Sequence, residues 1–383
     1  MKKSLLLLII ILLFPIGIQV HAQDDQLIPN SVSGVLIEST SGKILFEKEK
    51  EKEVSVASLT KMVVQIIILE EIESGNIKWD DIVTVSRNAS GMGGSQIYLE
   101  EGEKMSVKDL MKGISVASGN DATVAMAEYI SGSEEKFVQR MNTIIKKLGL
   151  KHTHFVNCTG LDEDNHYSSA YDMALIAREL VLNHPDIFTF SSIYEDYLRK
   201  DTDRKFWLVN TNKLISQYDG VDGLKTGHTD NAGYCLAATI QKNGMRLIGI
   251  VLGEQDSKVR NQETISLLEY GFQNVKMNIL KKKGDSIKTL YFDDTSPRKV
   301  NVVLKDDLSV LENIDANDKY TYDIELDKIS FPLKAGDIVG KIRVKRNHDI
   351  VSVGKLVSSS NVSRLSFLSL FFDNFFHFFF GIF

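Results

Sequence analysis

The chain of 383 residues has only two cysteines and five prolines, and it has no excess of basic residues. Two cysteines cannot form the disulfide framework of a small secreted domain. The 51 Asp and Glu residues outnumber the 45 Lys and Arg residues, and this acidic balance excludes a nonspecific nucleic-acid-binding protein. A composition of 43% hydrophobic and 25% charged residues also excludes collagen, wholesale disorder and a polytopic membrane protein. The length favours two domains, because domains usually contain roughly 100–200 residues.

Residues 1–22 have the three parts of a secretory signal peptide. Lys2 and Lys3 give a positive start, Leu5–Ile18 is almost entirely apolar, and the segment ends on the small residue Ala22. This layout predicts export with cleavage after Ala22, and the alternative is an uncleaved membrane anchor. Under either interpretation the rest of the chain leaves the cytoplasm.

Residues 363–383 predict an amphipathic helix. Ser366, Ser369, Asp373 and His377 follow at steps of three, four and four residues, so a helix places them on one narrow stripe. The rest of that surface is mostly Phe and Leu, which suits a helix lying in a membrane interface. We therefore expect peripheral attachment to the outer face of the cytoplasmic membrane, and the alternative is a helix packed on the protein's own core.

Between these ends, residues 28–275 predict one domain of the α/β (α+β) class. Strand patterns lie near both of its ends, including the two strands that flank Lys242-Asn243-Gly244, a strong hairpin signal. Helical patterns lie between them, at Ser58–Ser74, Val107–Ser115, Asp121–Ile130 and Ala170–Leu182. This order favours an antiparallel sheet flanked by helices.

Residues 277–357 have a different pattern. Short alternating runs are separated by turn residues, and they lie at Ser286–Tyr291, Lys299–Leu304, Tyr320–Glu325 and Ile338–Val344. No long helical pattern occurs among them, which predicts a small all-β domain. The Ser-rich stretch 357–362 that follows is typical of a linker.

The motif Ser58-Leu59-Thr60-Lys61 opens the first long predicted helix. Three residues of helix put Ser58 and Lys61 on one face, within reach of each other. A serine hydroxyl is a weak nucleophile until a base takes its proton, and a neutral lysine can do so. Burial or a second cation lowers the pKa of a lysine. The Ser58 N–H, at a helix N-terminus, can also help to stabilise an oxyanion.

Two further motifs follow, Ser118-Gly119-Asn120 between two helices and Lys225-Thr226-Gly227 just before a predicted strand. Ser118 offers a hydroxyl for proton relay to a leaving amine, and Asn120 offers an amide to hold a peptide. Lys225 supplies positive charge close to the other motifs, and Thr226 can donate to a substrate carboxylate. Gly227 has no side chain and so allows substrate to lie close to the strand. Each motif alone is weak evidence, but the ordered set is strong.

The ordered set resembles the motifs of low-molecular-mass penicillin-binding proteins that act as serine-type D-alanyl-D-alanine carboxypeptidases. Tyr167–Ala170 and Val221–Thr229 also look like that family, although Gly119 replaces the Asp of related middle motifs. The resemblance implies that Ser58 is the acylated nucleophile and Lys61 is its base. It implies the family's transpeptidase-like fold, a peptidoglycan stem peptide as substrate and acylation by β-lactams, without a metal or another cofactor.

The resemblance also implies roles in the rest of the cleft. Ser118 passes a proton, and the residues expected to bind substrate are Asn120, Lys225, Thr226, Gly227 and His228. The His228 N–H is expected to be the second oxyanion donor, and its side chain to border the cleft rather than act as a general base.

Recognition of the substrate carboxylate beyond Thr226 stays open at the level of sequence. Some members of the family carry an Arg before the third motif, where this chain has Thr211. Either Lys213 or Arg246 can supply the missing charge. The two cysteines, Cys158 and Cys235, can form a disulfide or remain as separate buried thiols.

Two other functions are compatible with the motifs. A class A β-lactamase needs a Glu-x-x-x-Asn loop for deacylation, and Glu179–Asn183 matches that spacing. However, the match lies within a helical pattern rather than in an irregular loop. A catalytically inactive wall-binding protein would keep the cleft but lack Ser58 or Lys61, and this chain has both.

Overall fold

The computed structural model describes residues 26–366 and residue 369. The predicted signal peptide, residues 1–22, lies outside the described residues, as do residues 367–368 and 370–383 of the predicted terminal helix. In the part of the chain that is described, no helix is long and apolar enough to cross a membrane.

The first part of the chain is built around an antiparallel sheet of five strands in the order β2-β1-β9-β8-β7. These strands are β1 (Ser33–Glu38), β2 (Ile44–Lys48), β7 (Val221–Thr229), β8 (Gly233–Lys242) and β9 (Met245–Glu254). Asn243 and Gly244 have φ values of 52° and 74°, as a tight hairpin between β8 and β9 requires. The prediction of an antiparallel sheet flanked by helices is confirmed.

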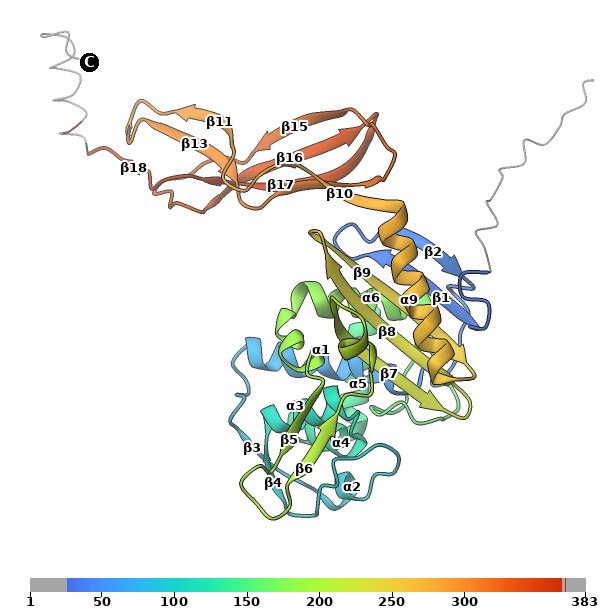
Figure 1. The fold of residues 1–383 in the computed structure, drawn as a ribbon. Helices are drawn as coiled ribbons and strands as arrows, with labels where there is room; N and C mark the ends of the chain where they lie inside the picture. Colours follow the sequence, from blue (N-terminus) through green and yellow to red (C-terminus); the bar gives the residue numbers. More distant parts are fainter. Residues whose placement is uncertain (1–25, 367–368, 370–383) are drawn as a thin grey trace, which may run out of the picture.

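Helices cover both faces of this sheet (Figure 1). The single helix α9 (Ser257–Asn274) packs on one face, and it shares an apolar core with Leu36, Leu236 and Leu247. The larger helical layer packs on the other face around α1 (Lys61–Glu73), whose residues Lys61–Leu69 are all buried. Its other members are α2 (Arg87–Ser90), α3 (Val107–Val116), α4 (Asn120–Ser131), α5 (Glu134–Lys147), α6 (Ala170–Asn183), η2 (Pro185–Ile187) and α7 (Phe188–Ser191).

Short elements complete this part of the chain. They are η1 (Ala57–Thr60), β3 (Ile82–Thr84), β4 (Lys104–Ser106), β5 (Glu195–Leu198), β6 (Phe206–Val209) and α8 (Leu214–Gln217). Two local predictions are wrong. Ser58 lies in the 3₁₀ turn η1 rather than in the α-helix that follows, and Lys225-Thr226-Gly227 lies inside β7 rather than before a strand.

Residues 275–364 form the all-β part that the alternating runs predict. Its main sheet has the order β11-β13-β17-β16-β15, with a separate β10–β14 pair and a short β12–β18 pair. The strands are β10 (Val275–Lys281), β11 (Ser286–Tyr291), β12 (Thr295–Ser296), β13 (Lys299–Leu304), β14 (Leu308–Asn313), β15 (Tyr320–Leu326), β16 (Ile338–Arg346), β17 (Asp349–Ser358) and β18 (Ser363–Arg364).

The linker predicted over 357–362 is wrong. Val357 and Ser358 belong to β17, and the buried Val362 pairs with Leu333. The Ser358 hydroxyl donates to the Ser360 carbonyl, so these serines build a turn of the β part.

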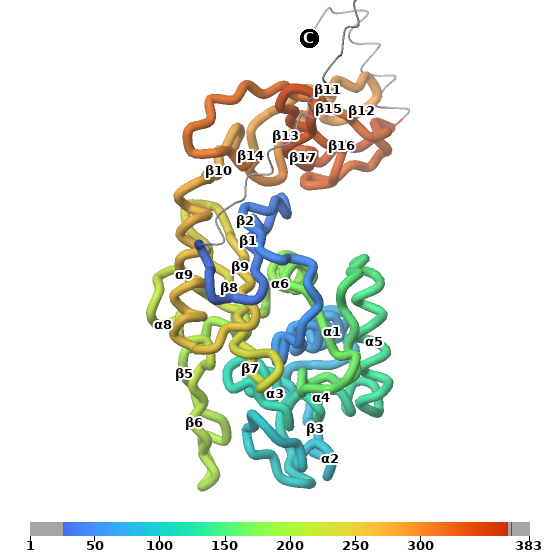
Figure 2. The backbone as a smooth tube through the Cα atoms, turned by 90° about the vertical axis from the view of Figure 1, so that its right-hand side faces the viewer, coloured from blue at the N-terminus to red at the C-terminus, as the bar shows by residue number. Residues whose placement is uncertain are grey.

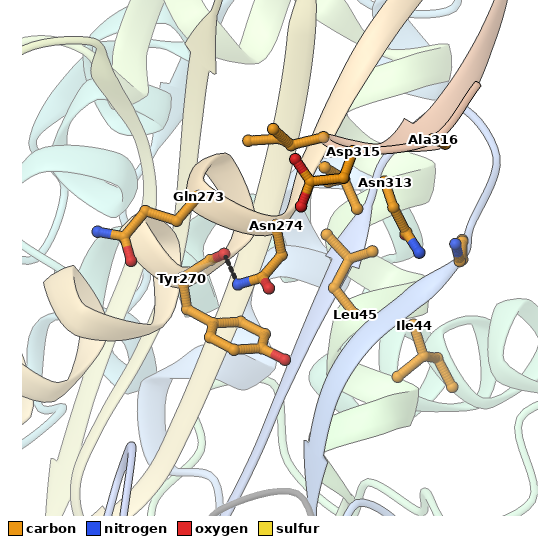
Figure 3. Close-up of a pocket in the computed structure, with 11 residues that line it drawn as sticks. Ile44, Leu45, Tyr270, Gln273, Asn274, Asn313, Asp315 and Ala316 are labelled. Carbon is orange, nitrogen blue, oxygen red and sulfur yellow. Dashed lines mark hydrogen bonds between the residues drawn. The ribbon is translucent and has the colours of Figure 1, made fainter.

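The two parts meet without an intervening loop, because α9 ends at Asn274 and β10 begins at Val275 (Figures 1 and 2). Val275, Met277 and Leu311 pack into the same core as α9. Beside them lies a pocket of about 660 Å³, which Figure 3 shows between Tyr270 and Asn274 of α9, Leu45 of β2, and the segment that follows β14.

Candidate active site

The first motif brings a hydroxyl and an amine into contact. Lys61 Nζ donates to Ser58 Oγ at 2.7 Å and to the Thr159 carbonyl oxygen at 2.6 Å. The Lys61 side chain is fully buried, and this burial lowers the pKa of its amine from 10.5 to about 7. The weaker influences of Cys158 and Asp121 act in the opposite direction. Near neutral pH the amine is therefore partly uncharged and can accept a proton from Ser58.

Ser58 sits in a turn that its neighbours hold tightly. Ala57 has a φ of 46°, which is uncommon for a residue with a side chain. A Cβ on Gly160 would lie 1.9 Å from the Ala57 carbonyl oxygen, so only glycine fits against this peptide. The left-handed φ of Gly160, 82°, is also one that glycine adopts without strain.

Gly227 supports the same turn from β7. A Cβ on Gly227 would lie 2.8 Å from the Val56 carbonyl oxygen and 3.0 Å from the Ala57 Cβ. The sequence suggests that Gly227 makes room for substrate, but the missing side chain would point toward η1. The glycine therefore allows η1 to pack directly on the strand that carries the third motif.

The second motif lies between α3 and α4. Ser118 has a φ of 62° and is almost buried. The Asn120 amide donates to the Gly93 carbonyl at 2.8 Å, while its Oδ1 is buried without a hydrogen-bond partner among the described residues. Asp121 accepts hydrogen bonds from the backbone N–H groups of Ile97 and Leu99, which fixes the neighbouring loop.

The third motif places a second buried lysine close to the first. Lys225 is 1% exposed, and its Nζ donates to the Thr226 carbonyl oxygen at 2.8 Å. Burial lowers the pKa of Lys225 well below its usual value, and the charges of Lys61 and Arg260 lower it further. Thr226 Oγ1 donates to Thr211 Oγ1 at 2.7 Å. Thr211 thus joins the third motif at the position where the resemblance leads us to expect an arginine.

One of the two candidate cations for a substrate carboxylate is already paired. Arg246 makes two hydrogen bonds to the Asp222 carboxylate, at 2.8 and 2.7 Å. Its guanidinium also lies over the Phe188 ring, 4.2 Å from the centroid. Lys213 Nζ lies 5.6 Å from the centroid of the Tyr194 ring, so its ammonium faces an aromatic side chain. These contacts disfavour Arg246 as a carboxylate ligand.

His228 follows Gly227 at the exposed end of β7. Its ring stacks on Tyr234 with the centroids 4.0 Å apart, and no hydrogen bond links it to Ser58 among the described residues. His228, Thr229 and Tyr234 line a pocket of about 430 Å³ at this end of the sheet. The stacking fits a side chain at the border of the cleft.

Both cysteines are free and buried. Cys158 Sγ donates to Glu134 Oε1, and Cys235 Sγ lies near the Ala232 carbonyl oxygen, so the alternative of two separate thiols is the correct one. Among residues 26–366, no group of three His, Cys, Asp or Glu side chains could hold a metal ion.

The β-lactamase match does not form a loop at the site. Glu179 and Asn183 both lie in α6, where Asn183 Nδ2 donates to Glu179 Oε2 at 2.8 Å. The preceding Arg178 donates to the Ser39 carbonyl oxygen, at the turn between β1 and β2. Glu179 is therefore bound within its own helix and is not placed to activate a deacylating water.

The sequence prediction missed the segment 157–166, which supports the nucleophile. Asn157 Oδ1 accepts from the N–H groups of Thr159 and Gly160, and this turn aims the Thr159 carbonyl at Lys61. Asp162 Oδ1 accepts from the hydroxyls of Ser55 and Thr229, joining the segment to the end of β7. An Asn followed three residues later by Gly is a turn signal, but it does not indicate what the turn contacts.

Comparison with family models gives two matches. A model described as D-alanyl-D-alanine carboxypeptidase matches residues 19–256. A model described as the C-terminal domain of penicillin-binding protein 5 matches residues 275–364. Together they cover both structural parts of the chain.

Two curated relatives align along most of the chain. The D-alanyl-D-alanine carboxypeptidase DacF of Bacillus subtilis is 41% identical over 377 residues, which are 96% of this chain and 97% of that protein. The D-alanyl-D-alanine carboxypeptidase DacA of Escherichia coli K12 is 34% identical over 361 residues, or 91% of this chain and 88% of that protein.

Solved structures agree with these matches. A peptidoglycan synthesis regulatory factor from Streptococcus pneumoniae has a TM-score of 0.76 at 26% identity, covering 87% of this chain and 99% of that one. Penicillin-binding protein D2 from Listeria monocytogenes, in its ampicillin-bound form, has a TM-score of 0.58 at 31% identity, covering 63% of this chain and 98% of that one.

Proposed function

Because the chain belongs to the family of D-alanyl-D-alanine carboxypeptidases, we propose that Ser58 is the nucleophile of its reaction. The protein is a serine peptidase that removes the terminal D-alanine from peptidoglycan stem peptides, and β-lactams bind at the same site. The observation that carries the residue assignment is the 2.7 Å contact between Ser58 Oγ and a buried Lys61 amine with a pKa of about 7.

In the acylation step, Ser58 Oγ attacks the carbonyl carbon of the penultimate D-alanine, and its proton passes to Lys61 Nζ. The oxyanion that forms is held by the N–H groups of Ser58 and His228. One such donor is typically worth about 10²–10³ in rate. The C–N bond then breaks, and the departing D-alanine takes a proton through Ser118 from Lys61 or Lys225.

Hydrolysis completes the reaction when water attacks the ester on Ser58. A β-lactam acylates the same oxygen, but its opened ring keeps the leaving nitrogen attached and hinders that water. A long-lived penicilloyl ester therefore distinguishes a carboxypeptidase from a β-lactamase, which hydrolyses penicillin rapidly.

We assign the D-alanine carboxylate to Lys225 and the Thr226 hydroxyl. In this role the Thr226 hydroxyl turns its proton to the carboxylate and accepts one from the Thr211 hydroxyl, 2.7 Å away, in place of a guanidinium. Asn120 is assigned to the substrate backbone, and its unpartnered Oδ1 supports this role because a peptide N–H would supply the missing donor. The backbone of Gly227 borders the substrate, and its absent side chain lets η1 approach β7.

The enzyme acts outside the cytoplasm, where peptidoglycan lies. We further propose that residues 1–22 direct export and that residues 363–383 attach the protein peripherally to the outer face of the cytoplasmic membrane. Residues 28–275 would then be the catalytic domain, and residues 277–357 would space it from that membrane.

The deciding experiment is mass spectrometry of the intact and digested protein after exposure to benzylpenicillin. We expect one stable penicilloyl adduct on the peptide that holds Ser58, and release of D-alanine from a D-Ala-D-Ala peptide by the untreated enzyme. Ser58→Ala should abolish both, with Ser286→Ala, at an exposed position of β11, as the matched control. Cleavage that survives Ser58→Ala would show that the nucleophile is wrong, and rapid penicillin turnover would favour a β-lactamase.

A further inference from the structure

We propose that His166 is a positioning residue for Ser58, acting through the Thr60 hydroxyl on the Ala57 carbonyl. This inference rests on the proposed role of Ser58 and adds to it a support from a distant part of the chain. His166 is 5% exposed and lies 106 residues beyond Thr60, yet its Nε2 is 2.9 Å from Thr60 Oγ1.

The hydrogen bonds fix the direction of this contact. The Val156 N–H, which can only donate, points to His166 Nδ1 at 3.2 Å, so Nδ1 must be an acceptor. A neutral imidazole then carries its proton on Nε2 and donates it to Thr60 Oγ1. Thr60 is left free to donate its own proton to the Ala57 carbonyl oxygen at 2.9 Å. The result is a relay of donors that ends on the peptide linking Ala57 to Ser58.

That peptide needs external support. Ala57 has a left-handed φ of 46°, a conformation that persists only where the surroundings hold it. On one side the backbone of Gly160 packs so closely that a Cβ there would lie 1.9 Å from the Ala57 oxygen. The Thr60 hydroxyl donates a side-chain hydrogen bond to the same oxygen. Losing it would free the peptide to rotate and move Ser58 Oγ away from Lys61 Nζ.

His166 is built to stay neutral. Its ring packs against Phe155 with the centroids 5.0 Å apart. Burial lowers the pKa of His166 to about 4, the charges of His154 and Lys61 lower it too, and Asp162 acts in the opposite direction. A proton on Nδ1 would face the Val156 N–H. His166 Nε2 therefore remains the donor to Thr60 throughout the pH range in which Lys61 titrates.

Two variants of His166 separate positioning from packing. Gln can place an amide nitrogen near the Nε2 position, which keeps the donor to Thr60 but removes the acceptor for Val156. Asn can place its oxygen near the Nδ1 position, which keeps that acceptor but removes the donor. Each variant thus loses one hydrogen bond and some ring packing, while only His166→Asn breaks the relay.

The experiment measures benzylpenicillin acylation of the full chain, separating the noncovalent dissociation constant from the acylation rate constant. We expect His166→Gln to acylate within about threefold of the parent and His166→Asn about tenfold or more slowly. A tenfold loss corresponds to about 1.4 kcal/mol, which lies within the range for losing one buried hydrogen bond. The dissociation constant should stay unchanged, and both variants should melt at similar temperatures. Equal rates for the two variants would overturn the proposal.

Thr60 gives a second, independent pair. Thr60→Ser keeps the hydroxyl and should acylate like the parent, whereas Thr60→Val should be slowed as much as His166→Asn. Combining Thr60→Val with His166→Asn should add no further loss, because both changes break one relay. Additive losses would overturn the relay. The site of the penicilloyl adduct tests the nucleophile separately. If the parent protein is labelled elsewhere than on Ser58, both the proposed function and this inference are wrong. If the parent is labelled on Ser58 but the variants acylate at the parent's rate, only this inference is wrong.

Discussion

The helical part and the all-β part of this chain place their charges in opposite ways. In the first, Lys61 and Lys225 are buried, and the charge of Lys61 helps to lower the pKa of Lys225. In the second, paired charges lie toward solvent, as where Arg343 contacts Glu325 at 2.5 Å, and the buried carboxylate of Glu312 accepts hydrogen bonds from Asn278 and Tyr320. The two parts thus show that unfavourable features gather where chemistry is done, and that the surrounding fold holds them in place.

Backbone strain follows the same division. Ala57 and Ser118, which precede or belong to the first two motifs, have positive φ values of 46° and 62°, and residues away from the motifs, such as Glu49 and Arg199, do so as well. In the β part the non-glycine residue with a positive φ is Asn347, in the turn between β16 and β17, where Asn is well tolerated. A substitution at the motifs of the first part should therefore be felt in catalysis, and a substitution in the second part only in stability, if at all.

The largest effect is expected from Lys61→Arg. A guanidinium cannot lose its proton at physiological pH, so it keeps the charge but cannot act as a base. Penicillin acylation should fall by about 10³-fold or more, toward the upper end of what general-base catalysis contributes. Lys258→Arg, on α9 and exposed, serves as the control. A loss smaller than about tenfold would assign the base to another group.

The pH profile of acylation tests the same group without mutation. With the Lys61 pKa near 7, only the fraction that is neutral can accept the Ser58 proton. The rate should rise about tenfold per pH unit below pH 7 and level off above it. Stopped-flow measurement from pH 5 to 9 checks this. Glu179→Gln should leave the profile unchanged, and a limb centred near pH 4–5 would point to a carboxylate base instead.

Gly227→Ala should have the next largest effect. The new Cβ would press on the Val56 carbonyl and the Ala57 side chain, and so would displace the turn that holds Ser58. A small displacement of a reacting group can cost about 10²-fold, and we expect a loss of roughly tenfold to a hundredfold in acylation. Gly91→Ala, at the exposed C-terminal end of α2, where a Cβ would come no closer than 3.2 Å to the Arg87 carbonyl oxygen, is the matched control. Equal behaviour of the two variants would contradict this account.

A smaller effect, on stability alone, is expected at the end of β9. Glu254 is fully buried beside Glu263, and burial together with that second carboxyl raises the pKa of Glu254 to about 8. Between pH 4.5 and 8 the folded state holds a proton that the unfolded state has lost, so this group's contribution to stability falls as pH rises. Glu254→Gln removes that dependence.

The comparison of parent and Glu254→Gln is made by urea unfolding at several pH values. The difference in unfolding free energy should change by up to about 1.4 kcal/mol per pH unit in this window, in favour of the variant at high pH. Taking the difference cancels the opposite contribution of His166. A difference that does not vary with pH would mean that Glu254 does not hold a proton in the folded state.

The smallest effect is expected from Arg343→Ala in β16. Exposed ion pairs contribute about 0–1 kcal/mol, so the unfolding free energy should change by no more than that. Acylation of Ser58 should not change at all. A reduction in acylation beyond twofold would show that the β part influences the site.

Local patterns were enough to predict much of the architecture. The runs Ser286–Tyr291 and Lys299–Leu304 coincide with β11 and β13, because alternation of apolar and polar residues reports a half-buried strand directly. The strand β17 was missed because Gly354 interrupts its alternation, where the missing side chain makes room for Leu308 and Ile342. The strand β7 was also missed, since it buries Lys225 and Thr226, which are uncommon in a strand core.

The site was predictable only where its contacts are close in sequence. The Ser58–Lys61 pair follows from three residues of helix-like backbone. The Lys61 contact with Thr159 spans 98 residues, and the Thr60 contact with His166 spans 106. No local periodicity reports such pairs, and His166 is one of eight histidines with no pattern to distinguish it. The support of the nucleophile is therefore a property of the fold rather than of any motif.

The continuous passage from α9 into β10 has a mechanical consequence. Since Val275, Met277 and Leu311 share a core with α9, bending at the junction would expose apolar side chains to water. The two parts should thus move together as one rigid body rather than bend at a hinge between them. If the proposed C-terminal attachment holds the enzyme, its active site would then lie at a fixed distance from the membrane and would reach only stem peptides at that distance.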